Sequence, residues 1–406
     1  MINKKTKSNL KQNKTYSAFS QIVKIWFHEY KTIFNDAGVI TLFVVAVLIY
    51  PILYTLAYNN EIVKEVPIVI VDEDDSEMSR KLVSMISATE EVKVLLKTPD
   101  YYEGILLFDK SKAYGVIVIP EDFQQKIYQF QSATVSVYAD ASYMIIYKQI
   151  MTAANYAIGT MGAGIEVQRR ISKQQQLQQA ISERDLLPLE VYSLYNPKGG
   201  YATYLMPAVF LLILQQTLLL GISLIGGTLH EKGHDDLLVQ TASKKGGAIA
   251  IVLGKSLAYY SIYLINALYI IVIVMWLFEL PMHANYFELF VFLTPFLFAV
   301  IYLSISVSTL FKKREHGLMV LLFTSIPFIF LTGFSWPTEA IPAWQNYLAQ
   351  LIPSTPAIKG FQAMSQRYAS FSQVSQHWVH IWALVLIYFA LASLSMKILI
   401  SRRLKK

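Results

Sequence analysis

The sequence predicts a polytopic α-helical membrane protein with six transmembrane helices and an inserted extracytoplasmic α/β domain. Apolar residues make up 54% of the 406-residue chain, and charged residues make up only 16%. The apolar residues gather in several runs that exceed the roughly 18 residues with which a helix crosses a bilayer. After the first run, β-branched stretches alternate with helical patterns over about 140 residues, which is typical of a layered α/β domain.

The composition also excludes several classes of site. The chain has no cysteine, which excludes disulfides, thiolate metal sites and a cysteine nucleophile. Its net charge of +7 is distributed as in membrane proteins, whose basic residues gather on the cytoplasmic side. The first 35 residues are basic and polar, and we predict no cleavable signal peptide. We therefore expect membrane lipid as a partner and no nucleic acid.

Residues 1–36 are predicted to form a cytoplasmic tail and an amphipathic helix. Between Ser17 and Asn35, apolar side chains recur at near-helical spacing among charged ones. Because a transmembrane run follows at once, we expect this helix to lie on the membrane surface, in preference to packing as an ordinary helix. The side chains expected at the interface are large and aromatic: Trp26, Phe27, Tyr30 and Phe34.

The first transmembrane helix is predicted at residues 37–57, and the extracytoplasmic α/β domain at residues 58–203. The expected strands are short apolar runs at residues 66–71, 92–96, 114–119 and 134–138. A long helix is expected after Asp140. Its segment Met144–Ile165 is apolar enough to resemble a span but contains Lys148 and Asn155. We therefore expect this segment to pack on the α/β domain or to graze the membrane.

An acidic cluster follows the first of these strands. Five carboxylates lie between Asp72 and Glu77, a number that could hold a hard cation such as Ca²⁺. The spacing is not that of an EF-hand loop. The favoured interpretation is a turn in which Asp75 or Ser76 caps the next helix.

Five further spans complete a transmembrane domain over residues 204–406. They are predicted at residues 204–228, 249–278, 287–311, 317–334 and 378–400. Six spans put both termini on one side of the membrane. That side carries more than half of the 35 Lys and Arg residues and fewer than a quarter of the 28 Asp and Glu residues. The positive-inside bias then predicts cytoplasmic termini in a multi-pass protein of the cell's inner membrane.

Residues 229–246 are a short charged island between two apolar runs. The island mixes both signs of charge and carries a ridge of apolar residues, so a cytoplasmic amphipathic helix fits it. Gly254, Lys255 and Ser256 resemble the end of a phosphate-binding loop, but Ile249 stands where that loop needs its first glycine. We expect Lys255 to reach the lipid headgroups instead. His230 and His234 lack a third ligand, so no metal site is predicted.

Polar side chains inside the predicted spans are sparse. Such groups are candidates for a translocation path, although contact between helices is the more common role. The candidates are Gln215, Gln216, Asn266, Ser304 and Ser308. We find no acidic or basic residue deep in any span, which argues against an ion-coupled transporter.

Three parts of the sequence together resemble the permease subunits of type-2 ABC exporters, in the subfamily with a large extracytoplasmic domain. The first comprises VPIVIVDEDDS at 66–76 and GVIVIPEDF at 115–123, and the second is the island with the Gly254-Lys255 pair. The third comprises LTGFSWP at 331–337, IPAW at 341–344 and LIPSTP at 351–356. The island departs from the family pattern at residues 234–236.

The resemblance implies half of an export channel, which pairs with a second permease chain in a homodimer or a heterodimer. ATP and Mg would bind a separate ABC ATPase subunit, and this chain would hold no cofactor. The residues expected to couple to the ATPase are Glu231, Lys232, Gly233, Asp235, Asp236, Leu237 and Leu238. Residues 335–376 would dip back as a re-entrant segment near the outer face. Its marker residues are Gly333, Trp336, Pro337, Pro342 and Pro353. Its aromatic residues Trp336, Trp344, Tyr347 and Phe361 suit a water–lipid boundary.

We therefore predict a transport permease, not an enzyme, that forms the path of an ATP-driven exporter. A periplasmic adaptor and an outer-membrane channel are optional further partners. One alternative is a membrane-anchored receptor or surface protein that binds ligand without an ATPase. Another is a membrane-embedded enzyme, against which the lack of a His, Asp and Glu cluster in the spans argues.

Overall fold

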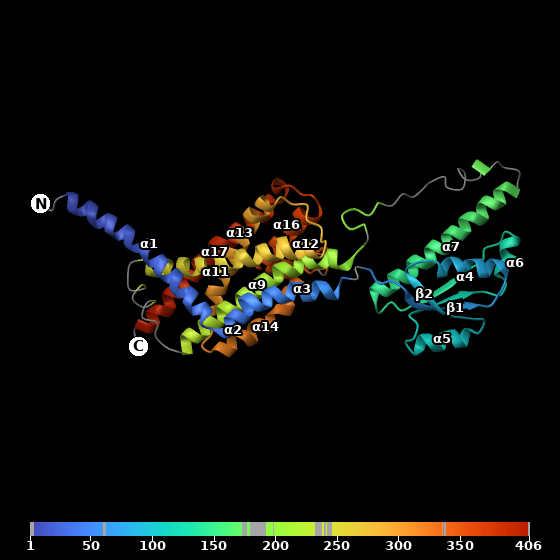
Figure 1. Cartoon of the computed structure of the whole chain (residues 1–406), viewed down its shortest axis with the longest axis horizontal. Coiled ribbons are helices and arrows are strands. Elements are labelled where there is room, and N and C mark those ends of the chain that lie inside the picture. Colours follow the sequence, from blue (N-terminus) through green and yellow to red (C-terminus); the bar gives the residue numbers. More distant parts are fainter. Residues whose placement is uncertain are drawn as a thin grey trace. The chain divides into compact units, whose positions relative to one another are not determined.

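The computed structural model describes the chain in two units. The described backbone comprises residues 4–59, 62–172, 177–178, 192–197, 199–231, 238, 241, 246–334, 336 and 338–404. One unit joins Met1–Glu61 to Ser193–Lys406, and the other is Ile62–Tyr192. The first unit is helical and the second contains a sheet (Figure 1).

Among the described residues of the first unit, six helical segments are long and apolar enough to cross a membrane. They are Ala37–Ala57, Tyr201–Glu231, Gly247–Leu277, Tyr286–Ser308, Arg314–Leu331 and Phe371–Ser401. The number and order of the spans agree with the prediction, and the first span has the predicted bounds. The last begins seven residues earlier than expected, at Phe371 in place of residue 378.

These spans consist of α2–η1–α3, α9, α11–η2–α12, α13, α14 and α17. Their elements are α2 (Ala37–Ile40), η1 (Thr41–Ala46), α3 (Val47–Ala57), α9 (Tyr201–Glu231), α11 (Gly247–Leu268), η2 (Tyr269–Val274), α12 (Met275–Leu277), α13 (Tyr286–Ser308), α14 (Arg314–Leu331) and α17 (Phe371–Leu404). The bundle is built around α9, which is buried along most of its length and packs against α3, α13, α14 and α16 (Ser354–Gln366). The elements η1 and η2 are π-helical turns.

The predicted outer segment folds into three short helices that do not span. They are η3 (Thr338–Ala340), α15 (Ala343–Ala349) and α16. Pro342 and Pro353 stand directly before α15 and α16, and Gly333 has a φ of 78° that favours glycine. Trp336 is exposed, and Pro337 lies outside the described residues.

One aromatic residue of this segment corrects the prediction. Phe361 was expected at the water–lipid boundary together with Trp344 and Tyr347. The latter two are exposed, but Phe361 is buried in the bundle core. The reason is that α16 packs between helices, with Gly360 directly against the ring of Phe292 on α13.

The second unit is a four-stranded sheet with helices on both faces (Figure 1). The strands β1 (Val66–Asp72), β2 (Val92–Thr98), β3 (Gly115–Ile119) and β4 (Ser136–Ala139) lie in the order β2-β1-β3-β4. The β1 pairings with β2 and β3 are parallel, and β4 is antiparallel to β3. The helices are α4 (Glu77–Ser87), α5 (Tyr101–Asp109), α6 (Phe123–Tyr128) and α7 (Met144–Ser172).

The long helix α7 belongs to this unit and is not a span candidate. Its residues Ile150, Ala153, Ala157 and Met161 are buried in the core that α7 forms with the sheet and α4. This position agrees with the expectation that Met144–Ile165 packs on the sheet. Capping by Ser76 is also confirmed, because its hydroxyl accepts the amide of Ser79 at 3.1 Å.

Candidate functional site

Two ion pairs lie at one end of the helical unit, near the segments on either side of the island. This end comprises the α1–α2 junction, the end of α9, the start of α11, the α13–α14 loop and the end of α17, and we call it the basic end. Helix α1 (Lys4–Phe34) packs along α11 there (Figure 1). The neighbouring residues Lys312, Lys313 and Arg314 give this end its name.

An ion pair is buried between α1 and α11. Lys255 Nζ lies 2.6 Å from Glu29 Oε2, and the two side chains are 5% and 1% exposed. The hydroxyl of Tyr259, one turn further along α11, donates to the other oxygen of Glu29. We call these three residues the latch. Because both charges are removed from water, each depends on the other for compensation.

The two helices approach closely enough to bury the latch because Gly254 precedes Lys255. A Cβ added at Gly254 would lie 2.7 Å from Ile25 Cβ and 2.8 Å from the Ile22 carbonyl oxygen. A side chain at this position would therefore push α1 away from α11. Two turns further along, the hydroxyls of Tyr30 and Ser261 are also hydrogen-bonded.

The latch corrects the prediction for Lys255. Lys255 does not extend to the surface, because Glu29 on α1 supplies a partner beside the span. The sequence did carry a signal for this. Ile25, Glu29 and Ile33 recur every four residues, and all three are buried on one face of α1. Lys255 and Tyr259 have the same spacing on α11.

A second ion pair ties three spans together at the same end. The Arg314 guanidinium, at the start of α14, donates to both oxygens of Asp36, and Nη1 also donates to Thr228 Oγ1 at 2.9 Å. Asp36 in turn caps α2 by accepting the amides of Gly38 and Val39. The hydrogen bonds from Arg314 and the helix amides hold the pKa of Asp36 below its ordinary value.

Glu231 completes this second cluster, which we call the clasp. Its Oε1 accepts the backbone amide of Arg314 at 3.0 Å. Glu231 is the last residue of α9 and one of the residues predicted to couple to an ATPase. The clasp therefore joins the start of the first span, the end of the second and the start of the fifth.

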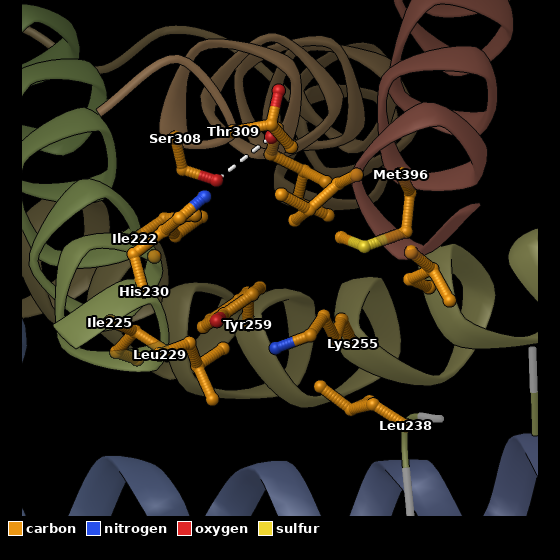
Figure 2. Close-up of a pocket in the computed structure, with 14 residues that line it drawn as sticks. Ile222, Ile225, Leu229, His230, Leu238, Lys255, Tyr259, Ser308, Thr309 and Met396 are labelled. Atoms are coloured by element: carbon orange, nitrogen blue, oxygen red, sulfur yellow. Dashed lines mark hydrogen bonds between the residues drawn. The ribbon is translucent and has the colours of Figure 1, made fainter. Parts of the chain in front are cut away.

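A small cavity of about 30 Å³ lies beside the latch, between α9, α11, α13 and α17. Figure 2 shows Leu238, Lys255, Tyr259 and Met396 around it. Leu238 comes from the island and is 6% exposed. It lines the same cavity as Lys255 and Tyr259 of the latch. The other predicted coupling residues, Lys232, Gly233, Asp235, Asp236 and Leu237, lie outside the described residues.

The predicted interfacial helix has two different faces. Trp26 and Tyr30 are partly buried against the bundle, while Phe27 and Phe34 are 65% and 56% exposed. The ring of Phe27 stacks on Trp26, and that of Phe34 stacks on Tyr30. The helix thus packs on α11 along one side and presents aromatic rings on another. Its position on a membrane surface stays a prediction.

Four of the five candidate path residues make hydrogen bonds within the described chain. Asn266 donates to the Phe43 carbonyl oxygen at 2.8 Å, and Gln215 accepts the amide of Ser354 at the start of α16. Ser304 and Ser308 donate to carbonyls of their own helix. The Asn266 and Gln215 bonds join different helices, whereas the two serine bonds stay within α13. A role of these residues in a translocation path stays a prediction.

Gln216 differs from the other four. Among the described residues, neither polar atom of its amide group has a hydrogen-bond partner, and both atoms are buried. An unsatisfied amide inside a membrane-spanning helix costs free energy. Of the five predicted path residues, Gln216 thus leaves both polar atoms of its amide without a hydrogen bond, and Gln215 leaves its Nε2 without one.

Six candidate spans, with a sheet-containing unit inserted after the first of them, are the features of a multi-pass membrane protein. The chain belongs to the family described as ABC-2 family transporter protein, which it matches over residues 37–394. The match covers all six spans apart from the last residues of α17.

Two curated proteins show similarity along most of their length. The chain is 22% identical over 364 residues to a "Probable multidrug ABC transporter permease YbhR" of Escherichia coli strain K12. The alignment covers 88% of this chain and 92% of that protein. The corresponding protein of Escherichia coli O157:H7 gives the same values. The chain is thus an ABC transporter permease by family, and such permeases work with an ABC ATPase in general.

Proposed function

We propose that this chain is the permease subunit of an ATP-driven exporter in the cell's inner membrane. A separate ABC ATPase binds ATP and Mg, and a second permease chain, identical or related, completes the translocation path. Both termini lie in the cytoplasm and residues 62–192 outside it. A periplasmic adaptor and an outer-membrane channel extend the path in cells with two membranes. The family membership, the resemblance in the sequence and the charge bias support this assignment.

The observation that carries the coupling role is the presence of two ion-pair clusters, the latch and the clasp, at the basic end. A partner that pushes on α1 moves α11 with it, because the latch buries one charge from each helix. A partner that pushes on the island, which follows Glu231, acts on the clasp. The clasp joins α9 to the first and fifth spans. Motion at these elements thus passes to several spans at once, as rigid-body transitions require.

Coupling is tested in the assembled complex of permease and ATPase, reconstituted in vesicles. Glu231, Leu237 and Leu238 are replaced together by alanine, and ATP hydrolysis is compared with that of the wild-type complex. Because Glu231 belongs to the clasp and Leu238 packs beside the latch, we expect the permease-dependent part of the hydrolysis to be lost. Glu339→Ala, at the opposite end of the bundle, is the control. Equal hydrolysis in all three complexes would overturn the coupling role.

The orientation has an independent test because the natural chain has no cysteine. A single cysteine is introduced at Ser87 on α4 or at Ser401 on α17, both exposed positions. A membrane-impermeant maleimide added to cells with an intact inner membrane is expected to label Ser87→Cys and not Ser401→Cys. Labelling of Ser401→Cys alone would reverse the proposed topology.

A further inference from the structure

A cavity of about 670 Å³ lies in the helical unit, at the end opposite the basic end. Its walls come from the end of α3, the start of α9, the turn after α12 and the residue that follows the C-cap of α16. We infer that this cavity binds an organic cation that carries an apolar or aromatic body. Under the proposed function it would be an exit-side subsite, but the binding itself does not depend on coupling to an ATPase.

The charge of the cavity favours a cation. Among the lining residues that the structure describes, Glu279 supplies the single carboxylate, and there is no Lys or Arg. Asn59 and Asn196 add amide groups that can accept hydrogen bonds from an ammonium group. An anion would meet the Glu279 charge without a compensating cation among these residues.

Four of the thirteen residues that line the cavity carry aromatic rings. Tyr195, Phe278 and Tyr368 line it, and the ring of His283 stacks on that of Tyr368 with centroids 3.8 Å apart and planes 14° apart. The face of an aromatic ring attracts a cation, and rings with a few placed polar groups are the usual lining of small-molecule sites. Aromatic walls around one carboxylate match an organic cation better than they match a metal ion or a sugar.

Several residues that line the cavity have a strained backbone conformation, which costs conformational free energy. Seven non-glycine residues in the described chain have positive φ, and three of them line this cavity: Tyr195 (66°), Glu279 (51°) and Tyr368 (56°). Glu279 and Tyr368 each follow the C-cap residue of a helix, a position that glycine usually fills. The positive φ angles are explained by the positions after helix ends. The choice of Glu and Tyr is not, because glycine would adopt the same φ with less strain. Strained residues that cluster around one cavity indicate a binding role.

The experiment measures binding of radiolabelled tetraphenylphosphonium to the purified full-length permease in lipid nanodiscs, with empty nanodiscs as the blank. Tetraphenylborate has nearly the same shape and the opposite charge, so it tests the sign of the site. The measurement is made at pH 8, where an ordinary imidazole is neutral. No ATPase is present, so a failure of the proposed coupling would leave the result unchanged.

Two substitutions locate the site. Glu279→Gln is expected to raise the Kd about tenfold, because it removes the carboxylate and keeps the size of the side chain. Tyr368→Leu should raise the Kd about threefold and Tyr368→Phe should leave it unchanged, since the ring face is the attracting group. Glu339→Gln is the matched control, because Glu339 is an exposed carboxylate at the same end that does not line the cavity.

Three results would overturn the inference. The first is equal binding of the cation and the borate anion. The second is a Glu279→Gln variant that binds as the wild type does, or that loses no more than Glu339→Gln. The third is absence of binding above empty nanodiscs by a wild-type chain that is monodisperse and has a cooperative thermal transition. The same thermal scan on each variant ensures that a lost site is not a lost fold.

Discussion

Removing one member of the latch should destabilise the permease far more than removing a surface ion pair. Lys255→Met keeps the length of the side chain and removes its charge, which leaves the Glu29 carboxylate buried with only the Tyr259 hydroxyl as partner. Breaking a buried pair in this way costs ~3–5 kcal/mol. Tyr259→Phe removes one neutral donor to the carboxylate and should cost ~1–3 kcal/mol.

Two controls isolate the effect of burial. The pair Lys64–Glu90 has side chains that are 57% and 77% exposed, so Glu90→Gln should leave the free energy of unfolding nearly unchanged. The double variant Glu29→Leu with Lys255→Met removes both charges, and it should recover most of the stability that Lys255→Met loses. This recovery separates an unpaired charge from lost packing.

The assay is unfolding of the purified chain in mixed micelles of increasing sodium dodecyl sulfate content. The helical circular dichroism signal and the fluorescence of the six tryptophans report the transition. We expect the order of stability to be wild type, Glu90→Gln, Tyr259→Phe, then Lys255→Met. The reasoning is refuted if Lys255→Met unfolds together with Glu90→Gln, or if the double variant is less stable than Lys255→Met alone.

Three further predictions use the same unfolding assay. Gly254→Ala should lower the free energy of unfolding by ~1–3 kcal/mol, because its Cβ would press on α1. Gly162→Ala, whose Cβ meets open space, should leave that free energy unchanged or raise it by up to ~1 kcal/mol. Equal effects of the two variants would contradict the close approach of α1 and α11. Asn266→Leu should lose ~1–2 kcal/mol because the Phe43 carbonyl loses its side-chain donor; an unchanged transition would show that this bond adds nothing. The pKa of Asp36 is lowered from 3.8, chiefly by its hydrogen bonds from the arginine of the clasp, so the clasp stabilises fully above that pH and less as the pH falls below it. Between about pH 5 and pH 3 the wild type should therefore lose more stability than Asp36→Asn, and parallel losses would count against the clasp.

The spans and strands could be predicted because their signals are local. Apolar length identifies a span, and alternating strand and helix patterns identify the sheet unit. Ser76 was predictable as a cap because a helix start depends on a few adjacent residues. The polar content of Met144–Ile165 favoured a helix packed on the α/β domain, and the packing of α7 agrees.

The candidate site was less accessible because its contacts join distant parts of the chain. Glu29 and Lys255 are 226 residues apart, so neither sequence neighbourhood shows the other. Lys255 read alone resembles a surface lysine. Asn266 and Gln215 read alone resemble groups that line a path, yet each binds backbone of another helix. Only the fold shows these partners, and only the fold shows that both polar atoms of the Gln216 amide and Nε2 of Gln215 lack one among the described residues.

The π-turn η1 explains an unusual repeat in the first span. The buried residues Val39, Phe43, Val47, Pro51 and Thr55 recur at a strict interval of four. A regular α-helix turns about 100° per residue, so a repeat of four would drift about 40° at each step and leave the buried side. The wider turn at residues 41–46 takes up part of this drift, so the five positions stay closer to one side of the span than they would in a regular helix. Deleting one residue from that turn would rotate the outer half of the span, so the first span should tolerate substitution there far better than a change of length.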